Sequence, residues 1–231
     1  MSAAAYFDVD GTLVDTNLLH PAVLVLANQP TPLQSVQRVG RALLDAPVLA
    51  ASELLDRRMF NERLFSHYRG ITRDRMRALS QEIFDSVTRP RIFKGTRDLI
   101  EKCRESGLRV VLVSGSLDYT IEPLAQYLGA DDWIANRLEY KSGKATGKLM
   151  RPVVAGPDKV GLIAQDAREH GHELADCHAY SDSYSDVPML SIVGHPFVIN
   201  PDRKLMRLAR AYDWPILDIT RPPRGPGGPR A

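Results

Sequence analysis

The sequence has little of several features that mark particular classes of protein. Its only two cysteines, Cys103 and Cys177, cannot form a disulfide framework, and their spacing matches no zinc motif. The longest apolar run, residues 22–27, is far too short to span a bilayer. Lys and Arg total 30 against 28 Asp and Glu, a net charge of +2, which gives no support for nucleic acid as a partner. We therefore expect neither nucleic-acid binding nor stable membrane insertion.

The small number of cysteines also bears on the cellular compartment. The two cysteines are best interpreted as reduced, buried thiols. The chain opens with a short apolar segment that soon carries acids, which is unlike a signal peptide. We expect a cytoplasmic protein. With 231 residues, of which 44% are apolar, the chain is long enough for one sizeable domain and a smaller one. Nothing in the sequence indicates an oligomeric state.

Short apolar runs alternate with helical periodicity along most of the chain. The runs that predict buried strands lie at 3–7, 108–113, 177–180 and 193–199. Strands that alternate with helices predict an α/β fold, here a Rossmann-like parallel sheet core with helices on both faces.

A long helical block interrupts this alternation after the first strand. We expect residues 15–89 to form a helical cap, residues 1–14 and 90–219 to form the core, and residues 220–231, rich in Pro, Gly and Arg, to form a disordered tail. Apolar residues of the cap recur at three- and four-residue steps, which predicts buried helix faces. The stripes are Leu55, Met59, Phe60, Leu64 and Tyr68, then Met76, Leu79, Ile83 and Val87.

Two carboxylates stand where the first strand ends. Asp8 and Asp10 alternate along an extended segment, so both side chains leave the strand on the same side. Gly11 permits a sharp turn, and Thr12 adds a hydroxyl at the same place. Two close carboxylates repel each other unless a cation or a proton intervenes. The arrangement predicts metal binding or catalysis.

Three other polar positions follow predicted strands. Ser114, Asp182 and Asp186 come directly after the second and third strands. Ligands of open parallel sheets bind beyond the carboxyl ends of the strands, so we expect these residues to converge with Asp8 and Asp10 in one crevice.

This set of residues fits phosphoryl transfer. An aspartate can attack phosphorus and become an aspartyl phosphate. Mg²⁺, which prefers oxygen ligands, would shield the phosphate from the carboxylates, with Asp8 and Asp182 as ligands and Asp186 as a ligand or its partner. Ser114 and the amides of Gly115 and Ser116, expected at a helix N-terminus, and Lys159, at the start of another helix, would hold the phosphate. We place Thr12 in the same phosphate-binding group.

Four motifs in order now give a resemblance. They are residues 8–12 (Asp-Val-Asp-Gly-Thr), 113–116 (Val-Ser-Gly-Ser), Lys159, and 182–186 (Asp-Ser-Tyr-Ser-Asp). The chain resembles the haloacid dehalogenase-like superfamily, and within it the phosphoserine-phosphatase-like branch with a small helical cap, subfamily IB. The resemblance runs from residue 3 to about residue 218.

The resemblance implies a role for each matched residue. Asp8 would be the nucleophile, and Asp10 would protonate the leaving oxygen and then activate water. Asp10 would also bind Mg²⁺ through its backbone carbonyl. Ser114 and Lys159 would hold phosphate, Asp182 would bind the metal, and Asp186 would support it. The implied activity is that of a Mg²⁺-dependent phosphatase acting on a small-molecule or lipid-derived phosphomonoester.

One departure from the family pattern bears on the substrate. Phosphoserine phosphatases carry a substrate-binding glutamate shortly after the first motif, and by register Asn17 stands there. A neutral amide cannot pair with an ammonium group as a carboxylate does, which argues against phosphoserine itself. Two other readings stay open: phosphotransfer to an alcohol, as in a phosphomutase, and a non-enzymatic binding module. The second would need a lost nucleophile, and Asp8 and Asp10 are both present.

Overall fold

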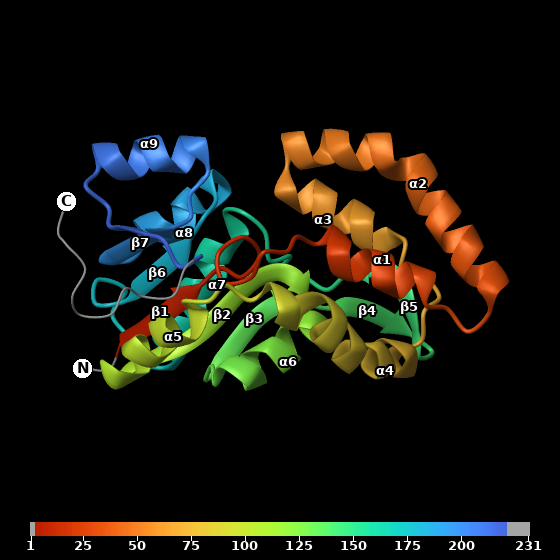
Figure 1. The fold of residues 1–231 in the computed structure, drawn as a ribbon, viewed down its shortest axis with the longest axis horizontal. Coiled ribbons are helices and arrows are strands. Elements are labelled where there is room, and N and C mark those ends of the chain that lie inside the picture. Colours follow the sequence, from red (N-terminus) through yellow and green to blue (C-terminus); the bar gives the residue numbers. More distant parts are fainter. Residues whose placement is uncertain (1–2, 221–231) are drawn as a thin grey trace.

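A six-stranded parallel sheet forms the centre of the molecule (Figure 1). The computed structural model describes residues 3–220, apart from the side chain of Leu54. The strand order is β3-β2-β1-β6-β7-β8, so β2 and β3 lie on one side of β1, and the later strands β6, β7 and β8 lie on its other side. The strands are β1 (Ala3–Phe7), β2 (Leu108–Leu117), β3 (Asp132–Asn136), β6 (His178–Ser181), β7 (His195–Ile199) and β8 (Ile216–Leu217).

Helices cover both faces of the sheet. Alternate residues of β1 point to opposite faces: Ala5 and Phe7 join a hydrophobic cluster under α5 and α6, whereas Ala4 and Tyr6 join one under α7, α8 and α9. The helices are α5 (Thr96–Glu105), α6 (Asp118–Leu128), α7 (Asp158–Glu169), α8 (Val187–Ser191) and α9 (Arg203–Ala211). The predicted α/β fold with a parallel sheet and two helical layers is therefore confirmed.

A group of helices between β1 and α5 lies to one side of the sheet (Figure 1). Its members are α1 (Leu19–Ala27), α2 (Pro32–Leu55), α3 (Arg57–Ser66), α4 (Arg73–Ile83), a π-helical turn (Phe84–Thr88) and a 3₁₀ turn (Arg89–Arg91). We call α1–α4 the cap. Thr31, Asp56 and Thr72 accept backbone hydrogen bonds at the starts of α2, α3 and α4, as N-cap residues do.

A β-hairpin far along the chain packs against the cap. It consists of β4 (Leu138–Lys141) and β5 (Lys144–Leu149), which pair antiparallel. Leu138, Ala145 and Leu149 share one hydrophobic cluster with cap residues such as Phe65 and Met76. The division of the chain into residues 15–89 and the rest stays a proposal, to which the structure adds that the hairpin shares the core of the cap.

Two local expectations were wrong in detail. The second strand was expected to end at 113, with Ser114–Ser116 at a helix N-terminus; instead β2 runs to Leu117 and α6 begins at Asp118. The register between β2 and β3 shifts between Ser114 and Leu117, so this stretch is an irregular strand end. In the cap, Leu55 and Met59 are exposed, although most of their stripe is buried. The tail predicted for 220–231 lies, except for Thr220, outside the described residues.

Candidate active site

The candidate site lies where β1 meets β6, at the carboxyl end of the sheet. The chain leaves β1 for β2 on one side and returns to β6 on the other, which makes this the switch point where open α/β sheets bind ligands. Asp8 directly follows β1, and its backbone N–H donates to the carbonyl of Tyr180 in β6 at 2.9 Å. The loop after β1 is therefore anchored to the neighbouring strand at the position of the first carboxylate.

Asp8 is a buried carboxylate held by two donors. Lys159 Nζ lies 2.6 Å from Asp8 Oδ1, and Thr12 Oγ1 lies 3.0 Å from Asp8 Oδ2. The Asp8 side chain borders a cavity of about 50 Å³ together with Asp10, Gly115, Lys159 and Asp186. A buried carboxylate facing such a small polar cavity is placed to react with a group that enters it.

Thr12 links Asp8 to Asp182. Its Oγ1 lies 2.8 Å from Asp182 Oδ1 and accepts a hydrogen bond from the backbone N–H of Asp182 at 3.0 Å. A hydroxyl has one proton, so it can donate to only one of the two carboxylates at a time. At any moment, therefore, either Asp8 or Asp182 lacks the hydrogen bond from Thr12.

Gly11 lets the Asp182 carboxylate approach the turn after β1. Its φ is +86°, and a Cβ built there would lie 2.3 Å from Asp182 Oδ2. Only glycine combines that backbone conformation with the space the carboxylate occupies. The glycine therefore sets the distance between the β1 turn and the loop after β6.

Asp10 is bonded by uncharged donors. Thr16 Oγ1 donates to Asp10 Oδ1 at 2.7 Å, and Ser116 Oγ donates to Asp10 Oδ2 at 2.8 Å. Ser114 Oγ lies farther from the same oxygen, at 3.4 Å, and accepts from the backbone N–H of Ser116. The two serines of the irregular β2 end thus face the same oxygen of Asp10.

Lys159 and Asp186 close the other side of the site. Lys159 Nζ lies 2.9 Å from Asp186 Oδ1 and 2.6 Å from Asp8 Oδ1, and both residues of each pair are buried. Ser181 Oγ donates to Asp186 Oδ2 at 2.8 Å. Lys159 Nζ also lies 3.0 Å from Asp186 Oδ2, so its three N–H groups face the oxygens of the Asp8 and Asp186 carboxylates.

Burial dominates the protonation equilibria of this cluster. Loss of hydration raises the pKa of Asp8 to about 7, and the Asp186 and Asp182 carboxylates add to that effect although Lys159 opposes it. Burial likewise raises the pKa of Asp182 to about 6. Burial acts to lower the pKa of Lys159, but the Asp186 and Asp8 carboxylates outweigh it and raise that pKa. The acids therefore crowd more negative charge into the site than the lysine neutralises.

This excess is what a divalent cation would neutralise. Asp8 and Asp182 share a single hydroxyl proton, and both have raised pKa values. Carboxylate and carbonyl oxygens are the donors that Mg²⁺ prefers. The residues present therefore fit a magnesium ion held by Asp8, Asp182 and the backbone carbonyl of Asp10.

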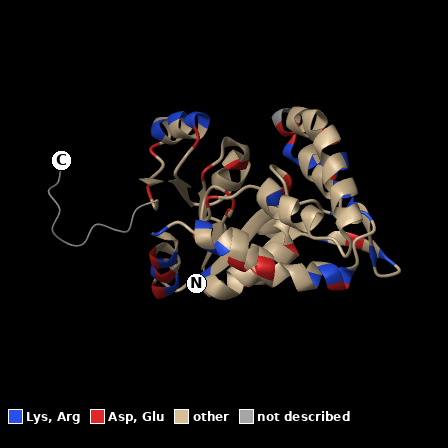
Figure 2. Cartoon of the chain, turned by 45° about the vertical axis from the view of Figure 1, so that its right-hand side comes forward, with Lys and Arg blue, Asp and Glu red and all other residues tan. Residues whose placement is uncertain are grey.

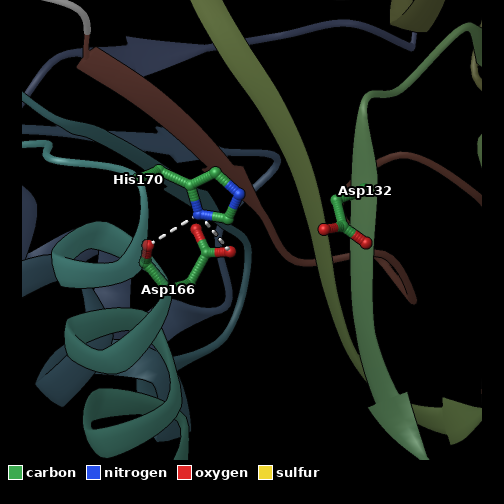
Figure 3. Close-up of side chains that lie close together, drawn as sticks. All are labelled: Asp132, Asp166 and His170. Carbon is green, nitrogen blue, oxygen red and sulfur yellow. Dashed lines mark hydrogen bonds and ion pairs between the residues drawn. The ribbon is translucent and has the colours of Figure 1, made fainter.

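A second group of possible metal ligands lies elsewhere. Asp132, Asp166 and His170 approach one another at the amino end of the sheet, opposite the candidate site (Figure 3). Arg109 donates to Asp132 and to Asp166, each at 2.8 Å. Tyr6 donates to Asp166 as well, at 2.9 Å. Because Arg109 pairs with both carboxylates and Tyr6 adds a hydrogen bond to Asp166, we interpret the group as an ion-pair network that joins α7 to β2 and β3.

The small cavity opens into a larger cleft between the cap and the core. That cleft has a volume of about 750 Å³ and shares Arg57, Gly156 and Ser185 with the small cavity. Asn61 of α3 reaches into the small cavity, with its Nδ2 3.5 Å from the carbonyl oxygen of Gly115. Two cap residues, Arg57 and Asn61, therefore line the small cavity, and Arg57 also borders the outer cleft.

The structure brings together most of the residues singled out from the sequence. Asp8, Asp10, Thr12, Ser114, Ser116, Lys159, Asp182 and Asp186 are joined by the contacts above, and Gly115 lines the cavity. Asn17 is different. It is exposed, and its Oδ1 accepts from the backbone N–H groups of Leu19 and His20.

Sequence reasoning missed three contributors. Thr16 and Ser181 bond the site carboxylates, and Asn61 lines the small cavity. The signal for Ser181 was its place beside the last motif. No pattern marked Thr16 or Asn61, because helical periodicity does not show which cap residues face the core. Residues 57–77 contain seven arginines, a signal for a basic lining, and one of them, Arg57, lines the small cavity.

Comparison with known proteins decides the family. The sequence profile of the haloacid dehalogenase-like hydrolases matches residues 5–191. The chain belongs to this family. It is 40% identical over 157 residues to the "Inhibition of morphological differentiation protein" of Streptomyces azureus, which covers 68% of this chain and 56% of that protein. It is 32% identical over 220 residues to "Phosphoserine phosphatase SerB1" of Mycobacterium tuberculosis, which covers 95% of this chain and 71% of that protein. The chain thus spans between about half and three quarters of these relatives.

A solved structure of a phosphoserine phosphatase has the same fold. The "Phospho-Aspartyl Intermediate Analogue of Phosphoserine phosphatase" superimposes with a TM-score of 0.67 at 20% sequence identity, over 96% of this chain and 94% of that one. The predicted resemblance to phosphoserine-phosphatase-like haloacid dehalogenase-like proteins is confirmed, and with it the prediction of a hydrolase.

Proposed function

We propose that this haloacid dehalogenase-like hydrolase is a Mg²⁺-dependent phosphomonoesterase in which Asp8 is the nucleophile. The observation that carries the proposal is the position of Asp8: it is buried, fixed by Lys159 and Thr12, and borders a small cavity with Asp10 on its wall. A nucleophile and an acid–base group on one cavity wall are the minimum that two-step phosphate transfer requires. A relative named phosphoserine phosphatase supports the reaction class.

The first step makes and breaks one bond to phosphorus. A carboxylate oxygen of Asp8 attacks, the bond from phosphorus to the leaving oxygen breaks, and Asp10 donates its proton to that oxygen. Bound Mg²⁺ would neutralise negative charge on the phosphoryl oxygens and on the aspartates. Lys159 and the Ser114 hydroxyl would hold the phosphate while this happens.

The serine contacts indicate which donors Asp10 and the phosphate would share. Before substrate enters, Ser114 and Ser116 face Asp10 Oδ2. A bound phosphate would compete for those hydroxyls and leave Thr16 as the donor to Asp10. Asp10 Oδ2 would then be free to hold the proton that passes to the leaving oxygen.

The second step returns Asp8 to its starting state. Asp10, now a carboxylate, takes a proton from water, and the water oxygen attacks the phosphorus of the aspartyl phosphate. The bond from phosphorus to Asp8 breaks, and inorganic phosphate leaves. Asn61 would restrict access of water to the small cavity while the cap is in place.

The outer cleft would hold the leaving group. Arg57 borders both cavities and is the cationic group nearest the small one on the cap side, so we propose that it recognises an anionic group on the substrate. Asn17 does not line the small cavity, so a substrate role for it would need a different cap position. A small-molecule or lipid-derived phosphomonoester fits a cleft of this size. Transfer to an alcohol in place of water uses the same residues and is separated from hydrolysis by acceptor competition.

The test compares Asp8→Asn with Asp15→Asn. Both remove one carboxylate, but Asp15 is exposed and does not line the cavity. We expect Asp8→Asn to lower kcat on an aryl phosphate by at least about a thousandfold, a barrier change of about 4 kcal/mol, while Asp15→Asn stays near wild type.

Turnover of Asp8→Asn within about tenfold of wild type would contradict a nucleophilic role for Asp8. A panel of phosphomonoesters, assayed with Mg²⁺ and with added alcohols, then identifies the substrate class. Phosphorylated alcohol among the products would show transferase chemistry at the same site.

A further inference from the structure

The outer side of α2 is apolar. Successive residues of an α-helix are rotated by about 100°, which places its large apolar side chains on one side of the helix. Leu33, Val36, Leu43, Leu44, Val48 and Leu55 are between 50% and 85% exposed. We call these six residues the α2 face. Six exposed aliphatic side chains on one side of a single helix mark an interaction surface.

Two polar residues of α2 attach the inward side of the helix to the rest of the cap, beside Leu49, which is buried in the cap core. Arg38 Nη1 donates to the backbone carbonyl of His67 at 2.9 Å, and Asp45 pairs with Arg63 and His67. Because these polar groups attach the helix to α3, rotating it to bury its apolar side would break them. The outward apolar face is therefore built into the packing of the cap.

Positive charge flanks the α2 face. A cavity of about 490 Å³ beside the helix is lined by Arg38, Arg41, Arg69 and Arg75, and no acidic residue lines it in the described chain. Burial and the neighbouring Arg41 lower the pKa of Arg38, a sign of crowded positive charge. Arg41 and Arg69 make no ion pair within residues 3–220. Residues 16–44 contain no Asp or Glu at all.

We propose that the α2 face docks the protein on the surface of a bilayer that carries anionic lipids. An amphipathic helix binds there by placing its apolar side among the upper acyl chains while arginines pair with lipid phosphates. Figure 2 shows α2 at the outer edge of the molecule, where the remainder of the chain does not obstruct such contact. No helix within residues 3–220 has the length and apolar content to cross a membrane, so α2 lies on the surface.

A second copy of the chain fits this surface less well. Two α2 faces packed together would bring their arginines near each other, and the two acids of α2, Asp45 and Glu53, already pair with Arg63 and Arg57. Lipid phosphates supply the missing negative charge. The α2 face also ends at Leu55, which lines the outer cleft, so docking would hold the mouth of that cleft close to the bilayer.

The test is flotation of the full chain with vesicles. Wild-type protein should float with vesicles of phosphatidylglycerol and phosphatidylcholine and bind phosphatidylcholine alone at least about tenfold more weakly. The double variant Leu43→Asp/Leu44→Asp should lose at least about tenfold in binding to the anionic vesicles. Arg41→Gln should lose about fivefold, and added salt should weaken the wild type. Tyr212→Asp, which alters a similarly exposed side chain after α9, is the matched control and should bind like wild type.

Three outcomes would overturn the proposal. They are absence of wild-type binding to anionic vesicles, equal binding of the double variant, and a wild-type dimer that the double variant converts to monomer without any vesicle binding. Circular dichroism and unchanged aryl-phosphate turnover verify that the double variant is folded. The binding measurement does not depend on turnover, so it stands or fails separately from the proposed enzymatic function.

Discussion

Replacing Lys159 by Met would leave two buried carboxylates without their cation. Lys159 Nζ lies 2.6 Å from Asp8 and 2.9 Å from Asp186, and all three side chains are buried. Met keeps most of the side-chain volume, so the change removes charge and hydrogen bonds with little loss of packing. The variant therefore isolates the electrostatic contribution of the lysine.

The size of the effect follows from the burial of the pair. Removing one partner of a buried ion pair costs about 3–5 kcal/mol, because the other charge stays desolvated and uncompensated. An exposed lysine contributes far less to the free energy of unfolding than a buried, paired one. Lys102→Met on α5 is the matched control, and we expect it to change stability by less than about 0.5 kcal/mol.

The cost should also depend on pH. A carboxyl whose pKa is higher in the folded state than in the unfolded state binds more protons when folded, so stability falls as pH rises between the two pKa values. Asp8 already behaves this way, with its pKa raised from 3.8 to about 7 by burial. Without Lys159 the pKa of Asp8 rises further. The destabilisation should therefore be larger at about pH 8 than at about pH 5.5.

Urea denaturation in chelator, at both pH values, measures these free energies of unfolding. The reasoning would be refuted by a Lys159→Met cost below about 1 kcal/mol at the higher pH. An equal cost at the two pH values would refute the assignment of the pH dependence to Asp8.

Two further predictions concern the metal and the turn that would hold it. Saturating Mg²⁺ should raise Tm by about 5–10 °C at about pH 8, and by less at lower pH because protons compete with the metal for Asp8 and Asp182. The variant Asp182→Asn should remove this increase. An unchanged wild-type Tm by calorimetry would count against the metal site. Gly11→Ala should lower the free energy of unfolding by at least about 1–2 kcal/mol more than Gly107→Ala does. Both glycines have a positive φ, but only at Gly11 would the added Cβ meet Asp182. Equal losses of stability in urea denaturation would show that the close approach is unimportant.

The sequence predicted those parts of the fold that depend on strand ends. Asp8, Asp182 and Asp186 each follow a buried apolar run, and parallel strands bring their carboxyl ends to one edge, so convergence followed from topology. Helix bounds such as 118–128 were also predictable, because periodicity and the flanking turn residues agree there.

The remaining features depend on packing between distant segments. Asn61 meets Gly115 only because the cap folds over the β2 end, and no local pattern encodes that contact. Leu55 and Met59 continue an apolar stripe whose other members are buried, and periodicity cannot tell a helix face that meets the core from one that faces outward. Asn17 occupies the expected place in sequence, but its side chain bonds the start of its own helix.

The most direct test of the central claim is to identify the phosphorylated residue. Asp10→Asn should slow the second step more than the first, because the acceptor water then lacks its base. Acid quench of this variant during turnover of an aryl phosphate, followed by borohydride reduction and mass spectrometry of the peptide that ends at Arg38, should place the phosphoryl group on Asp8. A phosphoryl group on any other residue, or turnover with no trapped phosphate in either the variant or the wild type, would contradict the account.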